Sequence, residues 1–482
     1  MKTVLLATLL CVLSIQISNA QWMPEVRLTN DPAASTGGFR VIAADGNVVH
    51  TVWNESADGN WEIYYKRSVD GGLSWEANIR LTNDPELSIL PTLAISGSAV
   101  HVTWGDLRDG NSEIYYKRSI DGGLTWGADT RLTNNSSISK YSSITSSGSN
   151  VHIVWFDGRD GNPEIYYKNS IDGGDTWSSD LRLTSNSGFS YIPVVAASGS
   201  VVHVAWYDST AGNWELYYKR STDNGSSWGA DSRLTNNSGE SKWPAIAVSG
   251  STVHLSWVEK RSGGTYTIYY KRSTNGGTSW GAEVAVTKKN YFNLYPCLAV
   301  NGSIVHLVYQ NLSNVTKYDI AYNSSVNGGA TWGSEVKLTS NQNNSSNASI
   351  AASGTTLHVI FQDDRDGNSE IYYKQKLNAP AGALSGLSDI NSGMVSKISL
   401  SQNDPNPFNP STKIRFVIPD NTFVNLVIYD ALGKEVETLV NEQLSVGTHE
   451  AVWSAGKYSS GVYYYRLTTG EFSQTNKMLL LK

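Results

Sequence analysis

Short apolar and polar runs alternate along most of the chain and return in the same order at steps of 51 or 52 residues. One unit shows four such runs, Pro91 to Ile95, Ala99 to Trp104, Glu113 to Arg118 and Arg131 to Thr133. We refer to them as the inner, second, third and outer strands of a unit. Runs this short predict β-strands, and the lack of long stretches with a period of 3.6 residues argues against helices. The sequence therefore predicts an all-β protein.

Two repeated motifs indicate how many units the chain contains. Val-His-x-x-Trp, or a close variant, marks the second strand, and its histidines stand at seven positions: 50, 101, 152, 203, 254, 306 and 358. Ser-x-Asp/Asn-x-Gly-x-x-Trp follows the third strand and ends at six tryptophans: Trp75, Trp126, Trp177, Trp228, Trp280 and Trp332. The outer-strand motif Arg-Leu-Thr first occurs at 27–29, before any complete unit, while the last unit stops after its third strand. We therefore expect a seven-bladed β-propeller in which residues 25–29 supply the outer strand of the last blade.

The composition changes at both ends of this repeat region. Residues 1–20 combine Lys2, an apolar run and a small-residue ending, which predicts a secretory signal peptide. The propeller is expected over 21–376, and residues 377–397 are small and polar enough to form a linker. Residues 398–482 carry a new set of short strand-like runs, which predicts a small immunoglobulin-like β-sandwich.

Charge and cysteine content narrow the range of partners. Without Lys2, which leaves with the predicted signal, 36 basic residues face 43 acidic ones, a net charge of −7. No basic stripe is visible, so nucleic acid is disfavoured as a partner, and no run outside the signal approaches the roughly 20 apolar residues that span a bilayer. Cys297 is the one cysteine after the signal, which excludes an internal disulfide and predicts a buried small hydrophobic residue.

The tail carries family motifs. Asn403 to Ile414 (Asn-Asp-Pro-Asn-Pro-Phe-Asn-Pro-Ser-Thr-Lys-Ile), Val427 to Glu435, Gly461 to Arg466 and Lys477 to Lys482 resemble the C-terminal sorting domain of type IX secretion cargo. The resemblance implies a Gram-negative bacterium and the type IX secretion machinery as a partner. It also implies that the protein is secreted or held on the outer-membrane cell surface, with the tail removed during release or attachment.

The repeated turn also resembles a known family. Ser68, Asp70, Gly72 and Trp75 match the Asp-box, or BNR, repeat of the sialidase superfamily, and the match extends over 22–376. In that family the box is a folding element, in which a short polar side chain bonds the turn, glycine accepts positive φ and tryptophan packs inside the blade. The corresponding polar residues here are Asp70, Asp121, Asp172, Asp223, Asn275 and Asn327. Because asparagine can bond a turn but cannot act as a catalytic acid, these residues are expected to be structural.

Two other registers could bind a metal. The seven histidines lie one strand out from the expected axis, so interblade packing and hydrogen bonding are favoured over a shared ion. Two residues beyond each second-strand aromatic residue come Glu55, Asp106, Asp157, Asp208, Glu259, Asn311 and Asp363. An Asx turn with an Asp–Arg pair is favoured over a calcium loop, because the oxygens do not follow a recognised ligand spacing. No metal or cofactor is expected, and Asp106, Asp157, Asp208 and Glu259 are retained as candidate ligand contacts.

The entry to the inner strands varies most between units and is the candidate binding site. Phe39, Tyr141, Trp243 and Tyr295 would form a rim on which sugar rings stack, with burial in the core as the alternative. Arg40 is the one charged residue in its register. With its neighbours it resembles the Phe-Arg-Ile-Pro element of sialidases, whose arginine clamps the substrate carboxylate. The proline is missing here, and no catalytic residue can be assigned.

The similarity between units bears on function. A glycosidase needs one asymmetric pair of reactive groups, whereas near-identical copies suit multivalent binding. We expect a secreted or cell-surface propeller, a monomer, that binds an extracellular glycan or glycoprotein. The alternatives are a glycoside hydrolase of the exo-sialidase kind or a polysaccharide lyase acting on extracellular glycans, and thirdly a structural adhesin.

Overall fold

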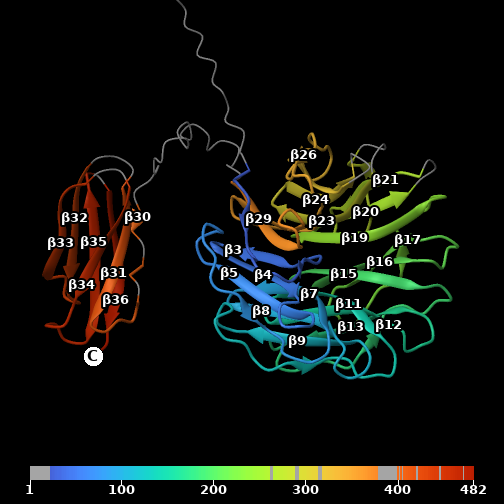
Figure 1. Cartoon of the computed structure of the whole chain (residues 1–482), viewed down its shortest axis with the longest axis horizontal. Coiled ribbons are helices and arrows are strands. Elements are labelled where there is room, and N and C mark those ends of the chain that lie inside the picture. The colour runs from blue at the N-terminus through green and yellow to red at the C-terminus, as the bar shows by residue number, and fades with distance from the viewer. Residues whose placement is uncertain are drawn as a thin grey trace, which may run out of the picture. The chain divides into compact units, whose positions relative to one another are not determined.

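The computed structural model describes residues 22–377 and 399–482, apart from 261–263, 288–291, 313–316, 401, 404, 419–421, 445–446 and 471. These residues belong to two compact units, one on each side of residue 378. Every regular element that the structure describes is a β-strand, so the all-β expectation is confirmed (Figure 1). The predicted signal peptide lies outside the described residues, as does the predicted linker from residue 378 onward.

The larger unit repeats one antiparallel sheet. Its simplest copy has the order β7 (Ser88–Ser96), β8 (Ala99–Asp106), β9 (Glu113–Ser119) and β10 (Thr130–Arg131). These are the inner, second, third and outer strands expected from the sequence. They form because β-branched and aromatic residues alternate with polar ones between glycine-containing turns.

The other copies use equivalent residues. The first is β2 (Ser35–Thr36), β3 (Ile42–Asp45), β4 (Val48–Glu55), β5 (Glu62–Ser68) and β6 (Ile79–Arg80). Two more are β11 (Ser139–Ser147), β12 (Asn150–Asp157), β13 (Glu164–Ser170), β14 (Leu181–Arg182), and β15 (Ser190–Ser198), β16 (Val201–Asp208), β17 (Glu215–Ser221), β18 (Ser232–Arg233). Next come β19 (Glu240–Ser249), β20 (Thr252–Lys260), β21 (Tyr266–Ser273), β22 (Val284–Ala285), and β23 (Phe292–Asn301), β24 (Ile304–Leu312), β25 (Asp319–Ser325), β26 (Val336–Lys337).

The last copy takes its outer strand from the beginning of the chain. β27 (Ser345–Ser353), β28 (Thr356–Asp363) and β29 (Glu370–Leu377) are completed by β1 (Val26–Arg27), which pairs with β29 through Val26↔Tyr373 and Arg27↔Tyr372 (Figure 1). Arg27 and Thr29 also bond the buried Glu370 carboxylate at 2.7 and 2.5 Å. Inner strands contact one another in the cyclic order β3, β7, β11, β15, β19, β23, β27 and back to β3.

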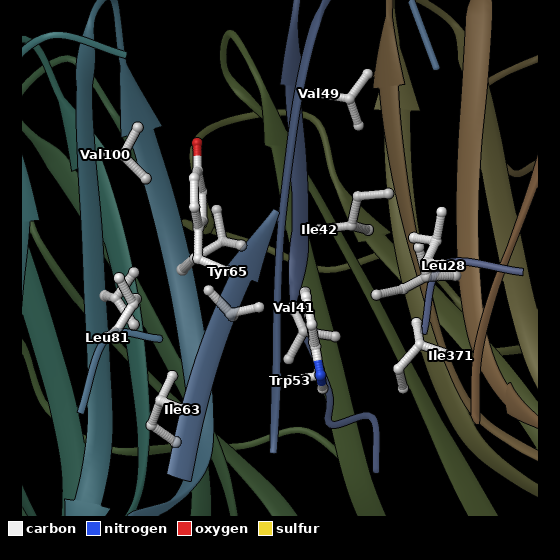
Figure 2. Packing of buried hydrophobic residues seen from close by; sticks show 14 of the residues in the cluster. Leu28, Val41, Ile42, Val49, Trp53, Ile63, Tyr65, Leu81, Val100 and Ile371 are labelled. Carbon is white, nitrogen blue, oxygen red and sulfur yellow. The ribbon is translucent and has the colours of Figure 1, made fainter. Parts of the chain in front are cut away.

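Neighbouring sheets share their apolar cores. Figure 2 shows one cluster in which Leu28 and Ile371, at the junction of the two chain ends, lie near Val41 and Trp53 of the first sheet. Trp53 is fully buried, and its equivalents Trp104, Trp155, Trp206 and Trp257 are fully buried as well. Burying one such large apolar side chain contributes about 1.5–3 kcal/mol, so each sheet depends on the two beside it.

A tyrosine on each third strand locks the next sheet in place. The Tyr65 hydroxyl lies 2.6 Å from His50 Nδ1, and its ring packs edge-on against Trp126 of the following turn at 4.9 Å. A Cβ added to Gly123 in that turn would lie 1.9 Å from the same hydroxyl. Equivalent ring pairs are Tyr116–Trp177, Tyr167–Trp228, Tyr218–Trp280, Tyr270–Trp332 and, across the chain ends, Tyr373–Trp75.

The turns that receive these tyrosines are held by their own polar side chains. Ser68 Oγ donates to Asp70 Oδ1 at 2.7 Å and accepts from the Gly72 amide at 2.8 Å. Asp70 Oδ1 in turn accepts from the Ser74 amide at 2.9 Å. In the corresponding turn Asn275 Oδ1 accepts from the Ser279 backbone amide at 2.9 Å. An asparagine side chain therefore bonds this turn in the same way as an aspartate does.

The smaller unit consists of two sheets around one core. One sheet has the order β30 (Ser399–Leu400), β31 (Ser411–Ile418), β34 (Gly447–Ser454). The other has the order β33 (Glu435–Leu444), β32 (Thr422–Tyr429), β35 (Gly461–Thr469), β36 (Phe472–Leu480). Phe416, Leu426, Trp453, Tyr465 and Met478 are buried together between them. Whether the topology is immunoglobulin-like stays a prediction.

The tyrosine lock can be tested with two glycines that share a backbone conformation. Gly174 has φ 92° and a Cβ there would meet the Tyr116 hydroxyl at 2.0 Å, whereas Gly161 has φ 93° and open space around it. We expect Gly174→Ala to cost about 2 kcal/mol more free energy of unfolding than Gly161→Ala, because only the former displaces a packed ring. Equal losses in denaturant melts would show that the lock adds nothing beyond backbone strain.

Candidate functional site

The inner strands share a kink that the sequence did not reveal. Each has one non-glycine residue in the left-handed region, with φ between 45° and 61°: Arg40, Leu90, Tyr141, Ile192, Trp243, Tyr295 and Asn347. In six strands this residue lies within the register shift in the pairing with the second strand. In the first sheet it falls in the break between β2 and β3. A left-handed non-glycine residue costs on the order of 1–3 kcal/mol and is found mostly at functional sites.

The seven kinks line one cavity. Its volume is about 320 Å³, and every inner strand contributes to its lining. The cavity brings together all five residues expected at the rim, Phe39, Arg40, Tyr141, Trp243 and Tyr295. We call it the axial pocket, since it lies at the centre of the cycle of inner strands.

Three of the aromatic rings form a continuous wall. The Phe39 and Tyr295 ring centroids are 5.1 Å apart, and those of Tyr295 and Trp243 are 4.9 Å apart. Tyr141 stands on another side of the pocket, 40% exposed, and packs against Phe156 at 5.7 Å. These rings are neither fully buried nor free, so each is held in place while part of its surface faces the pocket.

Arg40 reaches from the first sheet to three others. Its Nη1 donates to Ser143 Oγ at 2.8 Å and to the Val195 carbonyl at 2.7 Å, and its Nη2 donates to the Ile246 carbonyl at 2.9 Å. Burial lowers the pKa of Arg40 to about 10, which still leaves the guanidinium charged at neutral pH. The pocket therefore holds a cation whose hydrogen-bond partners are neutral oxygens.

The lining has a limited chemical repertoire. Besides the rings and Arg40, it includes aliphatic and proline side chains, Ser142, Cys297 and the Asn347 amide, and none of the described lining residues is Asp, Glu or His. Such a surface can stack on an apolar ligand face and hydrogen-bond to hydroxyls. It does not present the pair of carboxyl groups that glycoside hydrolysis ordinarily uses.

The acidic residues in the second-strand register lie elsewhere. Asp106, Asp157, Asp208 and Glu259 are fully or almost fully buried, do not line the pocket, and each accepts a hydrogen bond from the tryptophan two residues before it. Asp106 also accepts from the Arg108 amide at 3.0 Å and from its guanidinium at 2.7 and 2.8 Å. Burial raises the pKa of Asp106, but hydrogen bonds from Arg108 and Trp104 outweigh it and the pKa lies below its ordinary value. This geometry supports a structural role.

Each of the seven histidines of the larger unit is buried separately, within its own sheet. Each Nδ1 lies 2.6–2.8 Å from a tyrosine hydroxyl of the same sheet. Burial lowers the pKa of every one to about 4. Within the described part of the chain, no group of three or more His, Cys, Asp or Glu side chains is arranged to hold a metal ion.

These histidines make stability depend on pH. Unfolded imidazoles protonate below their ordinary pKa of 6.5, whereas the folded ones stay neutral down to about pH 4. The unfolded chain therefore binds more protons, and the free energy of unfolding falls as the pH drops from 6.5 towards 4. We expect the melting temperature to fall by about 10 °C or more between pH 7 and pH 5. The fall should be smaller in His152→Gln; a flat profile by calorimetry would contradict the assignment.

The sequence did not predict a second set of aromatic rings. Five rings contact one another near the end of β12, the start of β15, the end of β16 and the start of β17. We call them the outer aromatic group: Phe156, Phe189, Tyr191, Tyr207 and Trp214. They are spread over 59 residues of sequence. Strand pairing brings four of them together, and packing of the neighbouring sheet adds Phe156. One available signal was the aromatic residue directly after the second-strand tryptophan, present as Phe156 and Tyr207.

Comparisons with known proteins identify the smaller unit first. Residues 405–481 match the model of the secretion system C-terminal sorting domain. That domain marks cargo of the type IX secretion system, so export to the cell surface or the extracellular space is confirmed. No helix in the described residues is long and apolar enough to cross a membrane. No curated protein matches the chain.

Solved structures resemble about three quarters of the chain or somewhat more, at low identity. An ulvan lyase of polysaccharide lyase family PL25, bound to -[GlcA(1-4)Rha3S]-, is 11% identical with a TM-score of 0.53, over 73% of this chain and 95% of that one. The polysaccharide lyase Uly1 is 10% identical with a TM-score of 0.52, over 74% and 99%. A Trypanosoma rangeli sialidase is 13% identical with a TM-score of 0.43, over 81% and 84%. The two lyases show that the fold is shared.

Proposed function

We propose that the larger unit is a closed seven-bladed β-propeller of Asp-box (BNR) repeats that binds an extracellular glycan in its axial pocket. The observation that carries the proposal is the pocket itself, in which partly exposed aromatic rings and one cation meet at the centre of an otherwise repetitive structure. In this proposal residues 1–20 are the signal peptide, 377–397 the linker and 398–482 the immunoglobulin-like sorting domain.

The strand pairing supports the closed ring. The inner strands contact one another in a cycle, and β1 completes the last sheet from the other end of the chain. Trp22 takes the place of a box tryptophan in that sheet, since its ring packs edge-on against Tyr322 at 5.1 Å. Ser68, Asp70 and Gly72 bond one another as the Asp-box assignment requires.

Pocket size and chemistry support a sugar ligand. A cavity of about 320 Å³ is at the small end of the range for small-molecule sites. A pyranose presents an apolar face to a ring such as Trp243 and hydroxyls to groups such as Asn347 and the tyrosines. The charge of Arg40 favours a sugar that carries a carboxylate or sulfate.

Binding is preferred to hydrolysis because the described lining residues include no carboxyl group. A polysaccharide lyase is the second candidate, favoured by the presence of Tyr141, Tyr295 and Arg40 in one pocket. Burial raises the pKa of Tyr295, with Tyr318 and Tyr141 adding to the shift, so this hydroxyl is a poor base at neutral pH. Ultraviolet absorbance of an unsaturated uronyl product would reveal lyase activity directly.

The site is tested with the full mature chain on a glycan array, followed by titration of the glycans that bind. Trp243→Ala should weaken binding of neutral and acidic sugars alike by roughly 1–3 kcal/mol, because it removes a stacking surface. Leu90→Ala is the matched control for ring stacking, since Leu90 has the same left-handed conformation and lines the same pocket but offers no ring. If Trp243→Ala binds as the wild type does, the pocket is not the sugar site.

Arg40 separates charge recognition from stacking. Arg40→Met keeps much of the side-chain volume and removes the cation, so it should weaken acidic glycans and leave neutral ones within about twofold. The melting temperature must be followed in parallel, because Arg40 also bonds Val195 and Ile246. Loss of turnover of a sialoside or uronide in this variant would instead establish the enzyme. Equal weakening of all glycans together with early melting would show that Arg40 is only structural.

A further inference from the structure

The outer aromatic group lies at the same end of the larger unit as the axial pocket. Pairing of Ser190 with Asp208 and of Asp208 with Glu215 puts the start of β15, the end of β16 and the start of β17 side by side. Phe189, Tyr191, Tyr207 and Trp214 occupy these positions. The left-handed residues that line the pocket also come within the first few residues of the inner strands, so pocket and rings share one face.

The rings contact the pocket wall through Phe156, which is itself buried. Tyr141 lies 5.7 Å from Phe156, which lies 5.0 Å from Tyr191. Tyr191 lies 5.9 Å from Trp214 and 6.3 Å from Phe189. Phe156 and Tyr207 are buried and support the other rings, so the accessible rings beyond the pocket are Tyr191, Trp214 and Phe189. The distance from the pocket to Phe189 is longer than one sugar ring.

This surface is accessible and held in position. Phe189 is 47% exposed, and Tyr191 and Trp214 are partly exposed. The Phe189 amide donates to Ser209 Oγ at 2.9 Å and its carbonyl accepts from the Ser209 amide at 3.1 Å, which fixes the loop. Lys242 lies over the Trp214 ring at 5.3 Å and pairs with Glu240 at 3.1 Å, so polar groups border the rings.

The repeat itself does not require these rings. At the position of Phe189 the other sheets place Ala34, Leu87, Ile138, Glu240, Phe292 and Asn344. At the position of Tyr191 they place Thr36, Ile89, Lys140, Lys242, Leu294 and Ser346. Residues that maintain the fold, such as the buried tryptophans, recur from sheet to sheet, whereas the five-ring cluster forms in one sector. A smaller pair, Tyr266 and Phe292, lies beside Trp243 in another sector.

We propose that Phe189, Tyr191 and Trp214, the accessible rings of the outer aromatic group, form a second sugar platform beside the axial pocket, and that the ligand is therefore a linear oligosaccharide or polysaccharide rather than a single terminal sugar. The inference rests on the proposed glycan-binding function. A carbohydrate chain fits this surface better than a protein partner does, because exposed rings bordered by hydroxyls and charges offer both stacking faces and hydrogen bonds along one path.

The test is isothermal titration of the mature protein with size-fractionated oligosaccharides of ulvan, which is acidic, and of laminarin, which is neutral. For the fraction that binds, affinity should rise about tenfold from disaccharide to hexasaccharide. Phe189→Ala should lose most of that gain and leave disaccharide affinity unchanged, and because the side chain is half exposed the melting temperature should not move. Ile138→Ala, the 43% exposed equivalent in the neighbouring sheet, is the matched control and should retain the full gain.

The failures of the two proposals look different. If affinity is independent of length, or Phe189→Ala binds hexasaccharide as the wild type does, while Trp243→Ala weakens every length, the outer platform is wrong and the pocket stands. If Trp243→Ala changes nothing, or neither set of oligosaccharides binds, the glycan pocket is wrong and the platform falls with it.

Discussion

The tyrosine hydroxyl that lies between neighbouring sheets is the contact on which the larger unit depends. It holds a histidine of its own sheet, its ring supports the tryptophan of the next turn, and its tip fills the space above a glycine that must lack a Cβ. Four residues of two sheets therefore constrain one another at every junction except that of Tyr322, where Trp22 supplies the ring and no turn glycine among the described residues lies below the hydroxyl. Repetition of this contact around the cycle explains why His, Tyr, Gly and Trp recur in step along the sequence.

Because that lock supplies stability uniformly, the entry to the inner strands is free to vary. The seven left-handed residues share a backbone conformation but range from leucine and asparagine to tryptophan and arginine. The backbone strain is thus the same in every inner strand, whereas the chemical character of the side chain differs. Other scaffolds likewise carry variable binding residues on a rigid frame. The pocket obtains its asymmetry from side chains alone.

The sequence predicted the strands, their order and the residues that meet at the pocket, because turn chemistry and strand alternation are local properties. The sequence could not predict the burial of Asp106 or Glu259. A carboxylate next to a loop gives the same sequence pattern whether it faces solvent or bonds a buried tryptophan. The outer aromatic group was missed because Phe156, Tyr191 and Trp214 are far apart in the sequence. Strand pairing within one sheet and packing of the neighbouring sheet bring their rings together. The kink in the inner strands was missed because no glycine marks it.

Closure by β1 also sets an order of events during biogenesis. The first strand of the unit has its partner at the far end, since Val26 pairs with Tyr373, so the last sheet cannot be completed until residue 377 has been made and delivered. Until then β1 has no partner strand, and the closing contact has the largest sequence separation in the unit. An incomplete chain therefore leaves β1 unpaired, which makes the joining of the two ends the step most open to misassociation.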